Sequence, residues 1–218
     1  MPKTVVCLQQ KGGSSKTTLC IHVATMLKHL YPRKKVAVAD ADPQQSATMW
    51  MGKGAIEDIE LIQVAQDGDG KQLKKELADI NADVVFLDLP PFVESVSLRA
   101  ALYGNVILVP VGPSELDISA AQRPLDVCNE AVGLDPTKVV LIVPTRVREG
   151  TAAGKELRDV LAEMGRVSKA TIGMRTAYSD AVSAGVGVNH FAPGTKAYSE
   201  IEELTIEIAK ELGFGRPK

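Results

Sequence analysis

The sequence has few cysteines, few aromatic residues and no long apolar run. Its three cysteines, Cys7, Cys20 and Cys128, are odd in number, far apart and free of any CxxC pair, which argues against a disulfide framework and a zinc site. No window approaches the roughly 20 apolar residues that a membrane span needs. The chain runs from Met1-Pro2-Lys3 straight into an apolar segment, without the two regions of a signal peptide. We therefore expect a cytoplasmic protein.

An excess of charge of either sign is also absent. The 218 residues include 25 Lys and Arg against 27 Asp and Glu, a formal net charge of −2. Any nucleic-acid-binding surface is therefore expected to be a local basic patch rather than a property of the whole chain. The length suits one sizeable core, and no internal repeat or long linker interrupts it. We expect a single domain over residues 1–218.

What the sequence does contain is a series of short, continuous apolar runs separated by helical patterns. Continuous runs are typical of strands buried on both faces, as in a parallel sheet covered by helices. The sequence therefore predicts an α/β fold of three layers, with helices flanking a mostly parallel central sheet. Strands are expected at residues 4–9, 35–40, 83–89, 105–111 and 138–144, helices at 16–30, 71–80, 119–132 and 200–212, and a turn at Gly68-Asp69-Gly70.

A glycine-rich loop joins the first expected strand to the first expected helix. It reads Lys11-Gly12-Gly13-Ser14-Ser15-Lys16-Thr17-Thr18. In such a loop backbone N–H groups cradle phosphate oxygens, Lys16 lies against the β and γ phosphates, and Thr17 offers its hydroxyl to Mg²⁺. In the usual pattern, GxxxxGK[ST], glycines stand where this chain has Gln10 and Ser15. Strand, loop and helix in this order predict a P-loop, and with it the three-layer P-loop NTPase fold.

Carboxylates follow two further expected strands. Asp40 and Asp42 stand in the segment Asp40-Ala41-Asp42-Pro43-Gln44, and Asp88 ends a run of four apolar residues, as in a Walker B motif. Phosphoryl transfer needs a group that orients the attacking water and groups that neutralise charge, and Asp88 can reach a Mg²⁺ ion next to Thr17. The alternative for Asp42 is that it only caps a helix starting near Pro43.

These motifs together resemble the ParA/MinD class of ATPases. Their deviant Walker A signature, KGGxxK[ST], has a lysine at the place of Lys11, and the DxDPQ segment and the proline pair after Asp88 match as well. Residues 109–117 resemble the family's VPVxPSxLD stretch, apart from Glu115. There Ser114 either caps a helix or contacts a partner. The likeness covers almost the whole chain, and the length resembles the short ParA-type partition ATPases, which lack an N-terminal DNA-binding extension.

The resemblance implies ATP or ADP and Mg²⁺ as ligands, with slow, partner-stimulated ATP hydrolysis in a nucleotide-bound homodimer. It implies that Asp42 positions or activates the attacking water and that Asp40 supports Mg²⁺ through water. Lys11 would reach the phosphates of the other subunit and supply charge there, as an arginine finger does. The residues so assigned are Lys11, Lys16 and Asp42 to catalysis, Thr17, Asp40 and Asp88 to Mg²⁺, and Lys11, Gly12, Gly13, Ser14, Ser15, Lys16, Thr17, Thr18, Arg146 and Pro193 to the nucleotide.

ParA-like proteins also bind DNA without sequence preference, and a ParB-like centromere-binding partner stimulates them. The resemblance therefore implies a nucleoid-associated protein that segregates plasmid or chromosomal DNA. Between positions 146 and 175 seven basic residues outnumber four acidic ones, which suits non-specific DNA binding, although mixed charge is also common on a solvated helix face. The candidate DNA contacts are Arg175, by family position, and Arg158, Lys169 and Lys196.

Some related classes fit less well, and two interpretations stay open. A MinD-like protein ends in a membrane-binding helix, whereas glycine and proline break residues 212–218, so no membrane partner is expected. Residues 88–118 offer no thiol for a shared iron–sulfur cluster, and the CxxC pair of metal-insertion ATPases is missing. A ParA-like protein that positions a protein cargo stays open. So does a nucleotide switch that hydrolyses poorly, because serine at position 15 resists backbone angles that glycine permits.

Overall fold

A computed structural model of the chain describes residues 1–64, 71–91 and 94–217. Six parallel strands form one sheet in the order β3-β2-β4-β1-β5-β6. The five predicted strands are confirmed, and the turn predicted at residues 68–70 lies outside the described residues. The strands are β1 (Lys3–Cys7), β2 (Val36–Asp40), β3 (Ile59–Gln63), β4 (Val84–Asp88), β5 (Val106–Val111) and β6 (Val139–Pro144).

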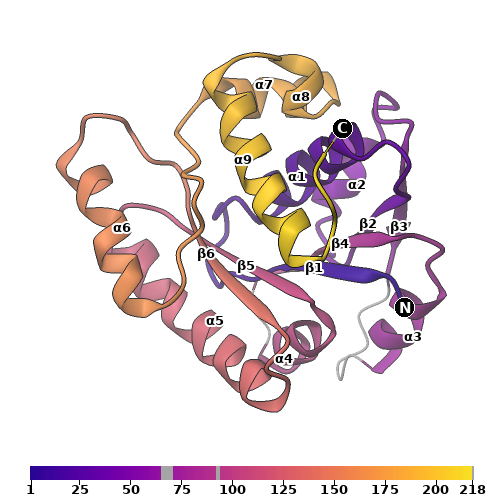
Figure 1. Ribbon diagram of the computed structural model, residues 1–218, viewed down its shortest axis with the longest axis horizontal. Helices are drawn as coiled ribbons and strands as arrows, with labels where there is room; N and C mark the ends of the chain where they lie inside the picture. The colour runs from indigo at the N-terminus through magenta and orange to yellow at the C-terminus, as the bar shows by residue number, and fades with distance from the viewer. Residues whose placement is uncertain (65–70, 92–93, 218) are drawn as a thin grey trace.

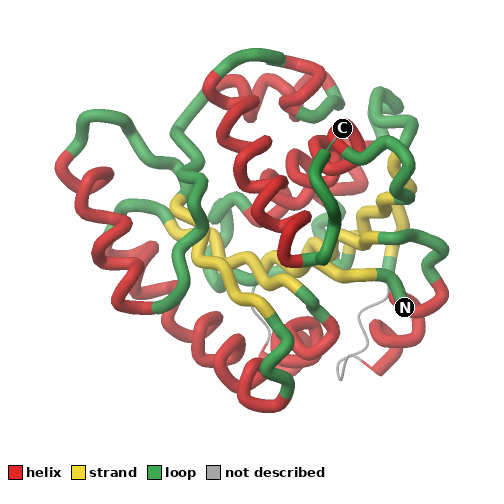
Figure 2. Tube along the Cα trace, in the orientation of Figure 1, coloured by secondary structure: helices red, strands yellow, loops and turns green. Residues whose placement is uncertain are grey.

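Helices cover both faces of the sheet (Figures 1 and 2). Successive strand side chains point to opposite faces, so that Val84 and Phe86 join one core while Val85 and Leu87 join the other. The three-layer α/β fold is confirmed. The first core is closed by α1 (Lys16–Leu30), α2 (Ser46–Met51), α7 (Thr176–Ala184), α8 (Val188–Phe191) and α9 (Lys196–Glu211), and the second by α3 (Lys71–Asp79), α4 (Glu94–Tyr103), α5 (Glu115–Leu134) and α6 (Ala152–Met164).

The two edges of the sheet are handled differently. Strand β3, which the sequence did not predict, is an edge strand, and of its five residues only Ile59 is buried, whereas Glu60 and Gln63 are exposed. At the other edge, residues 166–173 run beside β6, where Ile142 N–H donates to the carbonyl of Arg166 at 2.8 Å and Ile172 N–H donates to the carbonyl of Pro144 at 2.8 Å. This pairing brings residues 172–175 to the carboxyl end of the sheet, where ligands bind in such folds.

Helix α1 contributes a buried histidine to the core. His22 has no exposed surface; its Nδ1 accepts a hydrogen bond from Val188 N–H at 3.0 Å, and its ring packs edge-on against Trp50 with centroids 4.8 Å apart. Desolvation by burial lowers the pKa of His22 to about 3. The folded protein therefore keeps this imidazole neutral under conditions in which an unfolded chain would protonate it.

His22 is expected to make the fold sensitive to acid. Because its folded pKa lies below the unfolded value of about 6.5, its contribution is complete above that value and is lost as pH falls towards about 3. The free energy of unfolding is expected to fall by about 2 kcal/mol between pH 7 and pH 5 from this group. Urea unfolding of the wild type and of His22→Gln at both pH values measures it. An equal pH dependence in the two proteins would contradict the assignment.

None of the helices in the described ranges is long and apolar enough to cross a membrane.

Candidate active site

The P-loop lies between β1 and α1 at the carboxyl edge of the sheet, against a cavity of about 400 Å³. Residues 12–18 line this cavity together with Asp42 and Trp50. Lys16 is buried, and desolvation lowers its pKa, although Asp88 and Asp42 oppose that shift. The hydroxyl oxygen of Ser14 is buried and has no hydrogen-bond partner among the described residues. An orphaned donor beside a buried lysine fits a phosphate group.

The residues predicted to hold Mg²⁺ meet at the ends of neighbouring strands. Asp40 of β2 and Asp88 of β4 stand opposite each other in register, and Thr17 Oγ1 donates to Asp88 Oδ2 at 2.7 Å. Asp88 is fully buried, and its other oxygen has no partner in the described part of the chain. Desolvation raises the pKa of Asp88 to about 7, against the hydrogen bond from Thr17. A divalent cation beside this carboxylate would favour its ionised form.

Protein side chains alone do not complete a metal site here. Within the described ranges, no group of three or more His, Cys, Asp or Glu residues could hold a metal ion. Mg²⁺ is commonly bound by one or two carboxylates together with substrate phosphates and waters. A hydroxyl and a carboxylate next to a phosphate-binding loop fit that kind of site.

Asp40 has a second function in the structure, as the anchor of the loop that follows it. Its Oδ1 accepts from Asp42 N–H at 3.1 Å, and its Oδ2 accepts from both the N–H and the hydroxyl of Thr48, at 2.8 and 2.7 Å. These bonds tie the end of β2 to the start of α2 and hold Asp42 towards the P-loop cavity. An outer-shell role for Asp40 at Mg²⁺ stays a prediction.

Asp42 does not cap a helix. Helix α2 begins at Ser46, and its N-cap residue is Gln45, which makes no side-chain cap bond. The Oδ1 atom of Asp42 instead accepts from Gln44 N–H at 2.9 Å within a turn. The half-buried carboxylate lines the same cavity as Lys16, where it could orient a water molecule.

Ser15 adopts the backbone conformation for which a P-loop normally supplies glycine. It is the N-cap residue of α1 with φ 77° and ψ 17°, in the left-handed region. Its side chain makes no cap hydrogen bond, and it therefore gains nothing locally from being a serine. The left-handed conformation costs a residue with a Cβ atom roughly 1–2 kcal/mol, so the loop holds Ser15 in a strained geometry.

Ser15→Gly is accordingly expected to be tolerated. Relief of strain and the greater freedom of glycine in the unfolded chain oppose each other, so the free energy of unfolding should stay unchanged or rise by up to about 1 kcal/mol. Urea denaturation measures this change. Ser15→Ala serves as the control, because alanine keeps the penalty. A clear loss of stability in Ser15→Gly, with Ser15→Ala unaffected, would contradict a strained left-handed Ser15.

Lys11, assigned to the other subunit's phosphates, lies in this single chain against α5. Its Nζ contacts Asp117 Oδ1 at 2.8 Å, and Arg146 Nη2 contacts the same oxygen at 2.8 Å. Ser114 Oγ accepts from Asp117 N–H at 3.1 Å, so the predicted N-cap of this helix is confirmed. Burial alone would raise the pKa of Asp117, but hydrogen bonds from Lys11, Ser114 and Arg146 lower it to about 2. Gly112 permits this approach, because a Cβ atom there would lie 2.5 Å from Arg146 Nη2.

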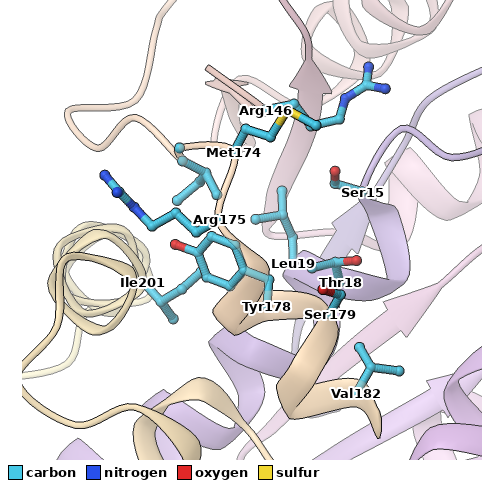
Figure 3. Close-up of a pocket in the computed structure, with 12 residues that line it drawn as sticks. Ser15, Thr18, Leu19, Arg146, Met174, Arg175, Tyr178, Ser179, Val182 and Ile201 are labelled. Carbon is cyan, nitrogen blue, oxygen red and sulfur yellow. The ribbon is translucent and has the colours of Figure 1, made fainter. Parts of the chain in front are cut away.

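A second cavity of about 320 Å³ continues from the P-loop (Figure 3). Ser15 and Thr18 form one side, and Arg146, Met174 and Tyr178 contribute to the other. Apolar and aromatic walls with a few polar groups are typical of nucleoside pockets, and the Nε atom of Arg146 is buried without a partner in the described residues. Arg146 thus lies where an adenosine group would be expected.

Of the two residues predicted for the nucleoside pocket outside the P-loop, Arg146 lines this second cavity. Pro193, the other predicted residue, is exposed and lies outside both cavities in the described structure. Met174 and Tyr178 were not assigned to the pocket. The only signal for them was their position in the segment that leads from the edge of the sheet into α7.

Of the four predicted DNA-contacting residues, Arg175 lines the second cavity and the other three lie outside both cavities. Three of the four are already hydrogen-bonded. Arg175 pairs with Glu200 and Glu149, and its guanidinium points away from Ser15 (Figure 3). Lys196 pairs with Glu149. Arg158 donates to the carbonyls of Ser168 and Lys169 and to the hydroxyl of Thr171, while the ammonium group of Lys169 has no partner within the described ranges. Part of the basic excess between positions 146 and 175 is therefore already engaged within the chain.

Comparison with known proteins shows the family. Residues 5–206 match the family described as CobQ/CobB/MinD/ParA nucleotide binding domain. The chain belongs to this family. Among its relatives, the maintenance of carboxysome distribution protein A of Halothiobacillus neapolitanus is 27% identical over 94% of this chain and 95% of its own length. The chromosome-partitioning ATPase Soj of Thermus thermophilus is 25% identical over 96% of this chain and 97% of its own length.

The fold has close structural neighbours within the family. The ATP complex of a variant of McdA from Cyanothece superposes with a TM-score of 0.77 at 21% identity, covering 100% of this chain and 98% of that one. The family binds ATP or ADP together with Mg²⁺. The protein is thus a P-loop ATPase of the ParA/MinD family.

Proposed function

We propose that this protein hydrolyses ATP slowly as a nucleotide-bound homodimer and uses the cycle to position a cargo along DNA. One observation carries the ATPase part: Lys16, Thr17 and Asp42 line a single cavity, with Asp88 hydrogen-bonded to Thr17. Each group matches a need of phosphoryl transfer, namely charge on the phosphates, a metal ligand and a water-orienting carboxylate.

The roles of the chain's own residues follow from these positions. Lys16 and the N–H groups of the loop bind the phosphates, and Thr17 and Asp88 would hold Mg²⁺. When bound, Mg²⁺ neutralises charge on the phosphate oxygens. Asp42, held by the loop that Asp40 anchors, orients the attacking water. Arg146 and Tyr178 would flank the nucleoside.

The contact between Lys11 and Asp117 supports the proposal that a single subunit hydrolyses ATP slowly. While Asp117 holds Lys11, this lysine is unavailable to a second copy. Dimerisation would transfer it to the partner's phosphates, where its charge is needed. Asp117 keeps Arg146 as a second cationic partner after that transfer, which lowers the cost of releasing Lys11.

Asp117→Asn is expected to favour the dimer. The half-exposed pair with Lys11 contributes about 1 kcal/mol or less. Because a homodimer releases two such pairs, the protein concentration needed for ATP-dependent dimerisation should fall by up to about 30-fold. Light scattering across a concentration series, with ATP and with ADP, measures this shift. Glu130→Gln, on the exposed side of the same helix, makes the same change in charge and serves as the control. Weaker dimerisation in Asp117→Asn would mean that Asp117 acts within the dimer rather than restraining Lys11.

The DNA part of the proposal is tested by retention on immobilised, non-specific double-stranded DNA. We expect retention with ATP and its loss with ADP, because only the dimer presents two copies of the basic segment together. Phosphate release is followed in the same samples. ATP turnover without DNA retention would support the ATPase activity and contradict the proposed DNA binding. The absence of turnover under all conditions would favour the nucleotide switch.

The cargo is proposed to be a protein assembly rather than a plasmid. A relative aligned over nearly its full length is named for maintaining carboxysome distribution, which favours a ParA-like ATPase with a protein cargo. Segregation of DNA with a centromere-binding partner is the second candidate, supported by the relationship to Soj. Deletion of the gene distinguishes them: loss of plasmids or chromosomes from daughter cells would support segregation, and normal inheritance with clustered protein assemblies would support positioning.

A further inference from the structure

A cluster of charged side chains lies where three segments of the chain meet. Glu149 comes from the loop before α6, Arg175 immediately precedes α7, and Lys196 is the first residue of α9. Glu149 Oε1 accepts from Arg175 Nη2 at 2.8 Å and from Lys196 Nζ at 3.1 Å, and its Oε2 accepts from Lys196 Nζ at 2.9 Å. One carboxylate therefore holds two cations from separate helices.

The second carboxylate of the cluster is built differently. Glu200 is mostly buried, and it accepts from Gly173 N–H at 2.9 Å, from Tyr178 Oη at 2.7 Å and from Arg175 Nε at 2.9 Å. It thereby fixes the backbone before α7 and one edge of the Arg175 guanidinium. Glu200 is a structural partner that orients Arg175.

Glu149, by contrast, contacts only the two cations among the residues that the structure describes. Its side chain is 62% exposed, and that of Lys196 is 70% exposed. Hydrogen bonds from Arg175 and then from Lys196 lower the pKa of Glu149, so the carboxylate is ionised at neutral pH. Ion pairs this exposed contribute little to stability and are readily replaced by another anion.

We infer that Glu149 occupies the place of a DNA backbone phosphate between Arg175 and Lys196, and that DNA must displace it to bind. This inference rests on the proposed DNA-binding function and concerns its regulation. The Glu149 carboxylate is shared by one guanidinium nitrogen of Arg175, Nη2, which Glu200 also binds, and by the ammonium group of Lys196. These N–H groups are the kind of donor that a phosphodiester group accepts. Glu200 keeps Arg175 oriented when Glu149 leaves, so the site is already formed beneath the acidic residue.

The balance of charges in the cluster favours a masked anion-binding site over a contact that only holds the loops together. Arg148, on the same loop, is exposed, and its Nε lies 3.2 Å from the sulfur of Met174. With Glu149 in place, three cations face two carboxylates, Glu149 and Glu200. Displacing Glu149 leaves three cations against one carboxylate, and a homodimer carries this change twice. Because affinity for DNA rises with each phosphate that is neutralised, such a change would act directly on retention.

The test measures the binding of fluorescently labelled, non-specific double-stranded DNA by anisotropy, with ATP, over a series of salt concentrations. Glu149→Gln keeps the shape of the side chain and removes its charge. It is expected to raise DNA affinity roughly tenfold and to steepen the dependence on salt, since cations already paired within the protein become free for phosphates. Glu156→Gln, an exposed position on α6, makes the same change in net charge and should alter affinity by less than about twofold.

A second variant tests whether the increase in DNA affinity comes from the freed cations. In the double variant Glu149→Gln/Lys196→Gln most of the increase should disappear, because the cation that it freed is gone. If Glu149→Gln binds DNA no more tightly than Glu156→Gln while the wild type binds DNA, the masking is wrong and the proposed function stands. If Glu149→Gln binds DNA and the wild type with ATP does not, the masking stands and DNA carriage by the unmodified protein fails. If neither binds DNA, both fail.

Discussion

Lys16→Ala is expected to abolish ATP binding. The ammonium group lies buried in the P-loop cavity, where charge-assisted hydrogen bonds to phosphates contribute about 1.5–3 kcal/mol each. A loss of about 3 kcal/mol corresponds to affinity at least roughly 100-fold lower. Isothermal titration calorimetry with ATP and Mg²⁺ measures this change. Lys3→Ala, at the exposed start of β1, is the matched control and should bind ATP normally. Retained affinity in Lys16→Ala would overturn the P-loop assignment.

The same variant is expected to fold. Burial lowers the pKa of Lys16 because the charged form is poorly solvated there, so removing the charge removes a desolvation cost. The free energy of unfolding without nucleotide should therefore not fall, and loss of ATP binding cannot be attributed to unfolding. Urea denaturation of the nucleotide-free proteins checks this point.

Asp42→Ala is expected to separate dimerisation from hydrolysis. The carboxylate lines the phosphate cavity and accepts a hydrogen bond from Gln44 N–H, so nucleotide binding and ATP-dependent dimerisation should persist. Loss of a group that orients or activates the attacking water should reduce turnover by roughly 10²–10⁴-fold. Phosphate release and light scattering on the same sample measure the two properties.

Asp42→Asn is the informative companion to this variant. Its amide oxygen can still accept from Gln44 N–H and preserve the turn, but it cannot take up a proton from water. Turnover should be lost in both variants if Asp42 acts on water. Normal turnover in Asp42→Asn, with loss only in Asp42→Ala, would assign Asp42 to the turn instead.

Much of the site could be predicted from the sequence because it is built from strand ends. The P-loop, Asp40 and Asp88 follow β1, β2 and β4, which are neighbours in a parallel sheet, and their carboxyl ends necessarily meet at one edge. The central strands could be predicted because their sequences are continuous apolar runs. Strand β3 was missed because an edge strand is half-exposed, and its Glu60 interrupts the apolar pattern.

The rest depends on contacts between distant segments. Asp117 meets Lys11 across 106 positions, and no periodicity predicts such a pair. The cavity proposed for the nucleoside is formed by the path of residues 172–178 along β6, so Tyr178 lines it and Pro193 does not. The predicted basic patch between positions 146 and 175 rested on a count of charges, and a count does not show which side chains are already paired. In the structure Arg175 and Arg158 are hydrogen-bonded within the chain.

The sequence alone showed that Ser15 departs from the usual P-loop pattern. Its left-handed backbone adds that this serine is held in a conformation that favours glycine.

The proposed active site is shared between two subunits, with Lys11 from one and Asp42 from the other, and a mixing experiment tests this most directly. Lys11→Ala and Asp42→Ala should each be inactive alone. In a mixed dimer, the nucleotide of the Lys11→Ala subunit has its own Asp42 and receives Lys11 from its partner. Random mixing in equal amounts should therefore restore about a quarter of wild-type turnover, since half of the dimers are mixed and each has one complete site. Turnover that stays at the level of the separate variants would contradict the shared site.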